Sequence, residues 1–151
     1  MNAFADFLSI EHDTGAKPVP LFRVDAPDGK RHLAEIDRQA TFRRIMRECA
    51  PRVTLYANAN AGRRRPGQAR KEGIRSGVFD MTGAWPLRCI AFPEFKGYDS
   101  SGRAGTLSED QIRWGNEMLE IGHHVASFFD PMAAVLWFKE IGAPVRIGAW
   151  A

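Results

Sequence analysis

Hydrophobic residues recur along the chain at the spacing typical of α-helices and at the spacing typical of β-strands. The helical spacing predicts three helices. The first covers residues 34–49, ends before a proline and carries basic side chains on its other faces. The second starts at Ser108, which is followed three residues later by Gln111, the pattern of a capping box. The third starts with Asp130 as N-cap and Pro131 in the first turn. The apolar residues of the three inner faces are Phe42, Ile45, Met46 and Cys49; Ile112, Gly115, Met118, Leu119 and Gly122; and Ala134, Val135, Phe138 and Ile141.

Shorter runs rich in β-branched and aromatic residues predict strands between these helices. The strands are expected at residues 53–56, 78–81, 88–95 and 123–129. Residues 83–86 predict a turn, so the second and third strands should form an antiparallel hairpin. Pro93 removes a backbone hydrogen-bond donor from the third strand, which predicts a bulge or a strand end there.

The N-terminal part of the chain is predicted to lie outside the core. Its Asp28-Gly29 pair is typical of a turn, so residues 21–25 and 30–33 are expected to form a short β-hairpin. The following order is helix, strand, loop, strand, strand, helix, strand, helix. It predicts an α/β fold with a central mixed β-sheet flanked by helices. We therefore expect an N-terminal extension at residues 1–33, the α/β domain at residues 34–142 and a C-terminal tail at residues 143–151.

Composition limits the class of protein. The 151 residues, 44% of them hydrophobic, suffice for one domain with its own core. No apolar run reaches the length of a membrane span, and the N-terminus lacks the features of a signal peptide, so we expect a cytoplasmic protein without a membrane partner. Cys49 and Cys89 are expected to be thiols buried in a reducing cytosol, although the sequence leaves a disulfide open. No zinc-binding spacing of Cys and His is present.

Positive charge is concentrated in one short segment. The net charge of +3 says little by itself, but six basic residues crowd between residues 63 and 75, opposed only by Glu72. Such a density, interrupted by Gly and Pro, predicts a loop that contacts phosphates, the alternative being an ordinary solvated loop. The basic residues are Arg63, Arg64, Arg65, Arg70, Lys71 and Arg75.

The strongest chemical signal is Asp80, followed on the next predicted strand by Glu94 and Lys96. Strand side chains alternate faces, so Glu94 and Lys96 emerge on the same side. If the Asp80 strand pairs beside them, two carboxylates and an ammonium group converge. Carboxylate oxygens and a backbone carbonyl suit Mg²⁺, and a lysine can orient water and offset charge on a phosphate. The alternative is a set of solvated charges at a sheet edge.

Two residues on predicted helices allow a structural or a functional interpretation. Glu35 either complements the positive end of its helix or points inward. Gln111 is the partner of the capping box, and this role is compatible with a place in the site.

Four motifs in this order resemble the virus-type replication-repair nuclease family of the PD-(D/E)xK restriction-endonuclease-like superfamily. The family pattern is similar to Gly-x-Pro-Asp, Glu-Phe-Lys, Leu-Ser-x-x-Gln and a Gly before the last core strand. The resemblance extends from Glu35 to Ile141, and Asn58 or Asn60 matches an Asn after the first strand of the family. The four motifs here are residues 73–80 (GIRSGVFD), 92–97 (FPEFKG), 107–114 (LSEDQIRW) and 122–125 (GHHV).

The resemblance implies a restriction-endonuclease-like core and assigns roles to these residues. Asp80 and Glu94 would hold Mg²⁺ or Mn²⁺, with the backbone carbonyl of Phe95 as a third ligand. Lys96 would orient water and stabilise the transition state, and Gln111 is the additional motif residue. A further acidic residue on the first helix would be Glu35, with Asp37 as its rival.

The chain departs from the family at two positions. Phe79 stands where a Pro usually precedes the catalytic Asp, which should leave activity intact because that Pro contributes no ligand. Pro93 directly precedes Glu94 and could displace its carboxylate. An error of about 1 Å in such a position can cost on the order of a hundredfold in rate.

The function implied by the resemblance is a Mg²⁺-dependent DNA endonuclease acting in replication, repair or recombination. Stand-alone members of the family resemble four-way junction resolvases and are often encoded by phages, which implies branched DNA as substrate and a bacterial or phage-infected host. Symmetric cleavage favours a homodimer, for which Trp137, Phe138 and Trp150 offer a candidate apolar surface, the alternative being that these aromatics belong to the core. The alternative is a non-catalytic nucleic-acid-binding module or regulator on the same fold.

Overall fold

A computed structural model describes residues 15–58 and 66–148, which form an α/β fold around one mixed sheet. Its five strands lie in the order β1-β5-β4-β3-β2. The pairs β2–β3 and β3–β4 are antiparallel, whereas β4–β5 and β1–β5 are parallel. The predicted α/β class and mixed sheet are therefore confirmed. The strands are β1 (Arg23–Val24), β2 (Thr54–Ala57), β3 (Met81–Trp85), β4 (Cys89–Phe95) and β5 (His124–Phe128).

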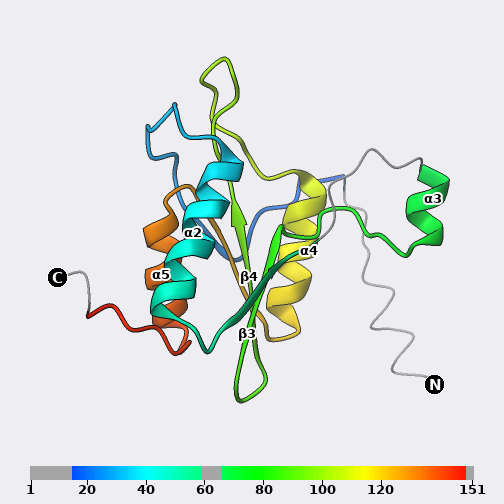
Figure 1. Cartoon of the computed structure of the whole chain (residues 1–151). Coiled ribbons are helices and arrows are strands. Elements are labelled where there is room, and N and C mark those ends of the chain that lie inside the picture. The colour runs from blue at the N-terminus through cyan, green and yellow to red at the C-terminus, as the bar shows by residue number, and fades with distance from the viewer. Residues whose placement is uncertain (1–14, 59–65, 149–151) are drawn as a thin grey trace, which may run out of the picture.

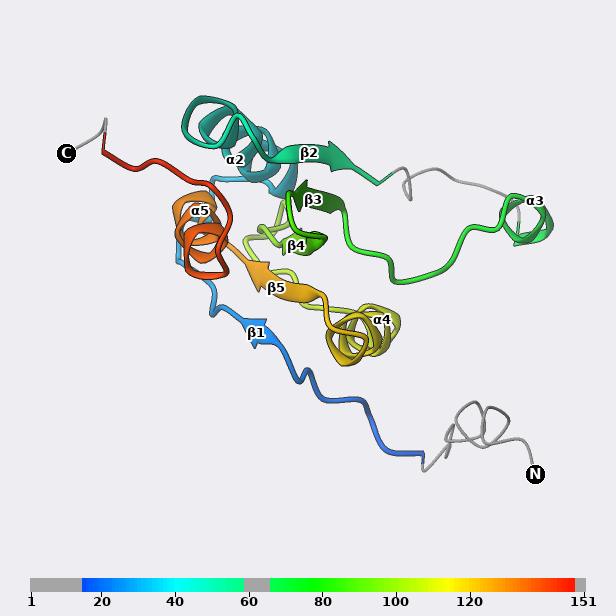
Figure 2. The same cartoon turned by 90° about the horizontal axis from the view of Figure 1, so that it is seen from below.

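Helices cover both faces of this sheet. Figures 1 and 2 show α2 and α5 on one face, α4 on the other, and α3 standing away from the sheet. The capping box of α4 and the Asp130 cap of α5 form as the sequence predicts. The helices are α2 (Glu35–Cys49), α3 (Pro66–Lys71), α4 (Glu109–Glu120) and α5 (Pro131–Glu140). Among the described residues, no helix has the length and apolar character needed to cross a membrane.

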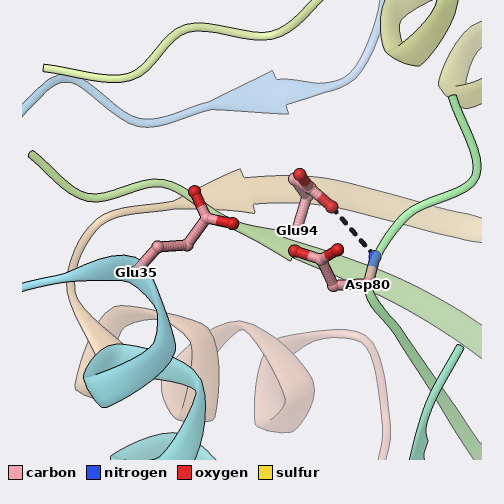
Figure 3. Close-up of side chains that lie close together, drawn as sticks. All are labelled: Glu35, Asp80 and Glu94. Atoms are coloured by element: carbon pink, nitrogen blue, oxygen red, sulfur yellow. Dashed lines mark hydrogen bonds between the residues drawn. The ribbon is translucent and has the colours of Figure 1, made fainter. Parts of the chain in front are cut away.

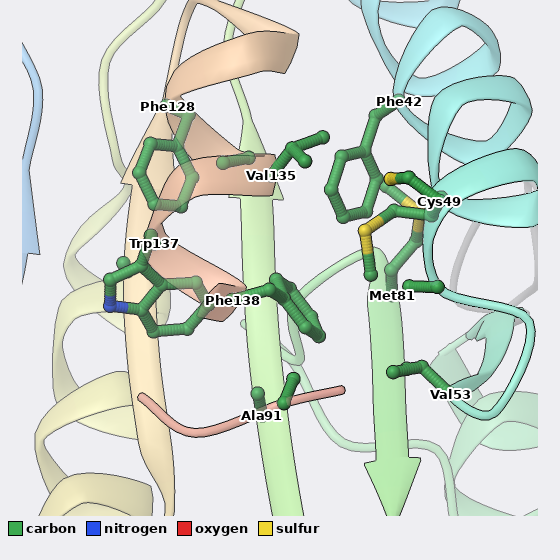
Figure 4. Packing of buried hydrophobic residues seen from close by; sticks show 14 of the residues in the cluster. Phe42, Cys49, Val53, Met81, Ala91, Phe128, Val135, Trp137 and Phe138 are labelled. Atoms are coloured by element: carbon green, nitrogen blue, oxygen red, sulfur yellow. The ribbon is translucent and has the colours of Figure 1, made fainter. Parts of the chain in front are cut away.

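The main core lies between the sheet and the α2–α5 pair. Phe42 of α2 packs against Phe95 of β4 and Phe138 of α5, with ring centroids 5.1 and 5.6 Å away, and Figure 4 shows this cluster. A second cluster lies under α4, where Trp114 contacts Phe79 at 5.1 Å. The two clusters fix α2 and α4 on opposite sides of β4, the strand that carries Glu94 and ends directly before Lys96.

Of the two interpretations of the C-terminal aromatics, the core is confirmed and the dimer surface is wrong for Trp137 and Phe138. Trp137 and Phe138 are buried in the main core, where their rings contact one another edge to face. Trp150 lies outside the described residues. The C-terminal aromatics that the structure describes therefore stabilise the domain itself.

The hairpin between β3 and β4 is displaced from its predicted position. Gly83 belongs to β3, and the turn falls at residues 86–88, so the predicted turn at 83–86 is wrong. Leu87 and Arg88 adopt φ values of 70° and 63°, a region that favours Gly or Asn, so the usual turn residues do not mark this turn. As a result, Asp80 lies directly before β3 and not within a strand.

The bulge or strand end predicted at Pro93 is wrong, because β4 continues through this residue in register with β5 as far as Phe95. The ladder between β3 and β4 nevertheless ends at Gly83 and Ala91, before Pro93 is reached. Successive backbone groups alternate sides, and the N–H of Lys96 points to β5, so the nitrogen of Pro93 faces the side of β3. The proline therefore removes no hydrogen bond between β4 and β5, and it lies where β3 and β4 separate.

The predicted N-terminal hairpin is also wrong. β1 pairs in parallel with β5 and becomes an edge of the main sheet. Residues 30–33 form no strand; Arg38 of α2 holds this region instead, because its guanidinium donates to the carboxylate of Asp28 and to the carbonyl oxygens of Lys30 and Leu33. The Asp28-Gly29 turn thus joins β1 to α2 and not to a second strand.

Candidate metal centre

Asp80 is fixed by contacts to its backbone from the end of β2. The N–H of Asn58 donates to the Asp80 carbonyl at 2.7 Å, and its side-chain amide donates to the Phe79 carbonyl at 2.7 Å. The amide oxygen of Asn58 accepts from Thr82 at 2.9 Å. Phe79 is fully buried against Trp114. Packing and hydrogen bonds thus hold the backbone at the position where the family pattern has a proline.

Glu94 points toward Asp80 from the neighbouring strand. Its side chain is only 1% exposed, and its Oε2 atom accepts the backbone N–H of Asp80 at 2.9 Å (Figure 3). This contact crosses the opening where the β3–β4 ladder has ended. The separation of the two strands therefore places both carboxylates in one site, as the sequence predicted.

Lys96 and Gln111 complete a buried network around Glu94. Lys96 Nζ donates to Glu94 Oε1 at 2.8 Å and to Gln111 Oε1 at 3.1 Å, while Gln111 Nε2 donates to Glu94 Oε1 at 2.6 Å. The same Gln111 oxygen accepts the N–H of Ser108 at 3.0 Å. Gln111 therefore caps α4 and contacts Lys96 and Glu94 with the same side chain, so the cap is compatible with a place in the site.

Glu35 joins the cluster from the first turn of α2. A β-carbon at Gly97 would lie 2.4 Å from the Glu35 nitrogen, so only glycine lets this turn approach the chain after Lys96 so closely. Carboxylate oxygens of Glu35, Asp80 and Glu94 lie within 4.8 Å of one another. Asp37 is exposed and is not in this group. Of the two interpretations of Glu35, the structure supports the inward one.

The motifs did not identify Gln39 as a site residue. It lies one helical turn after Glu35, and its Nε2 atom donates to Asp80 Oδ2 at 2.8 Å. The available signal was its spacing of four residues from Glu35, which puts both side chains on one face of α2.

Burial raises the pKa of all three carboxyl groups. It raises the pKa of Glu94 to about 7, with a further contribution from Asp80, while the nearby Lys96 opposes the shift. Burial likewise raises the pKa of Asp80 and of Glu35, and in both cases Lys96 partly offsets it. Groups that hold protons this tightly form a cluster in which additional positive charge is stabilising.

The donor set fits a hard divalent cation. Three converging carboxylates offer the oxygen ligands that Mg²⁺ and Mn²⁺ prefer, and a single ammonium group does not balance their charge. Glu35, Asp80 and Glu94 are the side chains that could hold such an ion. Phe95 directs its ring into the core on the opposite face of β4, and its carbonyl as a ligand stays a prediction.

The predicted basic segment is described only in part. Arg63, Arg64 and Arg65 lie outside the described residues. Arg70 and Lys71 are exposed on α3, away from the sheet (Figure 1). Arg75 forms an ion pair with Glu117 of α4, so part of its charge is already compensated.

Comparison with known proteins gave no match to a family model, a curated protein or a solved structure.

Proposed function

We propose that this chain is a Mg²⁺- or Mn²⁺-dependent DNA endonuclease with a restriction-endonuclease-like core, a member of the virus-type replication-repair nuclease family. The observation that carries the proposal is the convergence of Glu35, Asp80 and Glu94 beside Lys96. These residues come from α2, from the residue before β3, from β4 and from the residue after it. Glu94 is buried and the other two acidic groups are half-buried, an arrangement that costs stability and that is typical of functional sites.

In this proposal, Glu35, Asp80 and Glu94 hold the cation. A bound divalent cation supplies Lewis acidity that offsets charge developing on a phosphodiester. Lys96 contributes a fixed positive charge, oriented by Glu94 and Gln111, that can orient the attacking water and stabilise the transition state. Gln111 holds the side chains of Lys96 and Glu94 in position relative to one another, because it forms a hydrogen bond with each.

The substrate part of the proposal is DNA bound through the basic segment, with α3 presenting Arg70 and Lys71. Branched DNA and a homodimer belong to the proposal through the family resemblance alone, since Trp137 and Phe138 are core residues. The alternative is a nucleic-acid-binding module or regulator without catalysis. It shares the basic segment but gives no reason for three converging carboxylates.

A cleavage panel tests the proposal. The purified chain is incubated with linear duplex, single-stranded, flapped and four-way DNA, each with Mg²⁺, Mn²⁺ or a chelator. We expect cleavage that needs the cation, is lost in Asp80→Asn and is faster on branched substrates. Binding of DNA without cleavage under every condition would favour the non-catalytic module.

Light scattering addresses the oligomeric state. A monomer at all working concentrations that cuts linear and four-way DNA equally well would remove the resolvase-like part of the proposal. A simple nuclease would remain.

A further inference from the structure

Gln39 contacts the proposed metal centre without belonging to any motif that predicted it. Its amide nitrogen lies 2.8 Å from Asp80 Oδ2, and an ionised carboxylate can only accept, so Gln39 is the donor. The amide thus restrains rotation of the Asp80 carboxylate. Glu35, four residues earlier on α2, approaches the same carboxylate, so one helical face supplies both an acidic group and a donor to Asp80.

Both ends of this hydrogen bond are anchored. Arg38, adjacent to Gln39, is 1% exposed and donates to Asp28 and to the carbonyl of Phe129, which fixes the first turns of α2. On the other side, Asn58 holds the carbonyl of Asp80. A donor fixed in this way can hold a carboxylate in one orientation before any ion is bound.

The chemistry of an amide suits this position. Three carboxylates and one ammonium group already surround the site, and a neutral amide adds a donor without altering that charge. A lysine at residue 39 would pair with Asp80 and compete with a cation, whereas an aliphatic residue would leave the carboxylate free to rotate.

We propose that Gln39 is a positioning residue of the metal centre, which orients the Asp80 carboxylate so that Asp80 and Glu35 face the same cation. This inference rests on the proposed function. Gln39 acts through Asp80 and contacts neither the ion nor the DNA. Residues that orient a metal ligand typically contribute 10- to 100-fold to metal affinity or activity.

The test uses Gln39→Met, which keeps an unbranched side chain of similar length and good helix propensity but removes the donor. Mn²⁺ binding is measured by calorimetry on the full chain without DNA, together with the melting temperature of the cation-free protein. We expect the Mn²⁺ dissociation constant to rise about 10- to 100-fold while the melting temperature stays near that of wild type. Cleavage should be restored by raising the Mn²⁺ concentration.

Thr41→Val is the matched control, because Thr41 is half-buried on α2 but faces a hollow lined by Asp130 and Met132. Its Mn²⁺ affinity should equal that of wild type. Gln39→Leu serves as a second variant if the methionine variant fails to fold. Wild-type affinity in the Gln39 variant, or an equal loss in Thr41→Val, would overturn the positioning role. Absence of Mn²⁺ binding by wild type would instead contradict the proposed function.

Discussion

The backbone N–H of Asp80 donates to the side-chain carboxylate of Glu94 at 2.9 Å, so one acidic residue holds the other. A buried and a half-buried carboxylate repel each other when both are ionised, and this contact keeps them adjacent without a cation between them. The carbonyl of Asp80 accepts from Asn58 on the side of β2, whereas its N–H turns toward Glu94 beyond the point where the β3–β4 ladder ends. The arrangement is thus built into the fold and does not depend on the ion that the site would hold.

Replacing Asp80 by Asn should abolish cation-dependent cleavage. The amide has the same shape and can still accept the hydrogen bond from Gln39, but it removes a charged ligand. Since one of three neighbouring negative charges is lost, the melting temperature of the cation-free protein should not fall. Gel cleavage assays and thermal unfolding of the same preparation check both expectations. Normal turnover by this variant would mean that Asp80 is not a ligand.

Replacing Lys96 by Ala should separate cation binding from turnover. The change removes a positive charge 2.8 Å from Glu94 and leaves all three carboxylates in place. The variant should therefore bind Mn²⁺ at least as tightly as wild type does. The turnover rate should fall about 100- to 1,000-fold, as for other groups that stabilise charge in a transition state. Calorimetry gives the affinity, and single-turnover cleavage at saturating Mn²⁺ gives the rate. An unchanged rate would exclude a catalytic role for Lys96.

The stability of the cation-free protein should decrease as the pH rises from about 4.5 to about 7. The folded state raises the pKa of Glu94 from 4.5 to about 7, so it holds the proton more tightly than the unfolded chain does. The resulting stabilisation is complete below pH 4.5 and is lost as the pH passes through the folded pKa. Asp80 and Glu35 act in the same direction. Melting temperatures measured across this range check the slope.

Glu94→Gln is the control for this pH dependence, because it keeps the shape of the side chain and removes the titrating group. Its slope between pH 4.5 and 7 should be smaller than that of wild type. Adding Mg²⁺ at pH 7 and above should raise the wild-type melting temperature, since the cation replaces the lost protons. An equally steep slope in the variant would assign the pH dependence to other groups.

Neutralising Arg63, Arg64 and Arg65 together should weaken DNA binding about equally for all sequences. Each phosphate contact that is lost removes about one released counterion, so the dependence of log affinity on log salt should become flatter. Titrations of labelled DNA at several salt concentrations measure this slope. Arg75→Gln is an informative comparison, because Arg75 already pairs with Glu117 and should contribute less. If the triple variant keeps the wild-type slope, these arginines do not contact phosphates.

Local patterns predicted much of this fold and site. Apolar spacing placed α2, α4 and α5, and cap residues placed the starts of α4 and α5. Alternation along the extended chain through β4 predicted that Glu94 and Lys96, the residue after the strand, lie on one side, and the two side chains form an ion pair. These features depend on residues close in sequence, which is why they could be derived without knowledge of the tertiary structure.

The remaining features depend on contacts between distant segments. The β3–β4 turn contains Leu87 and Arg88 at positive φ, a conformation that the flanking strands impose without the usual turn residues. Trp114 and Trp137 are buried because of what packs on them, and the spacing rules had assigned neither to a core. Gln39 and Asp80 are 41 residues apart in sequence, so their hydrogen bond could not be predicted without knowing how α2 packs in the tertiary structure.

The pairing of β1 with β5 bears on where this protein can be cut for experiments. Both strands contribute to one sheet, and a fragment starting at residue 34, the predicted domain boundary, would lack Arg23–Val24. Such a fragment would present β5 as an unprotected edge with free N–H and C=O groups, the kind of surface on which chains associate with one another. It would also lose Phe22 from the cluster beneath α4. The short N-terminal strand thus protects the sheet from self-association, and it belongs in any fragment made for assay.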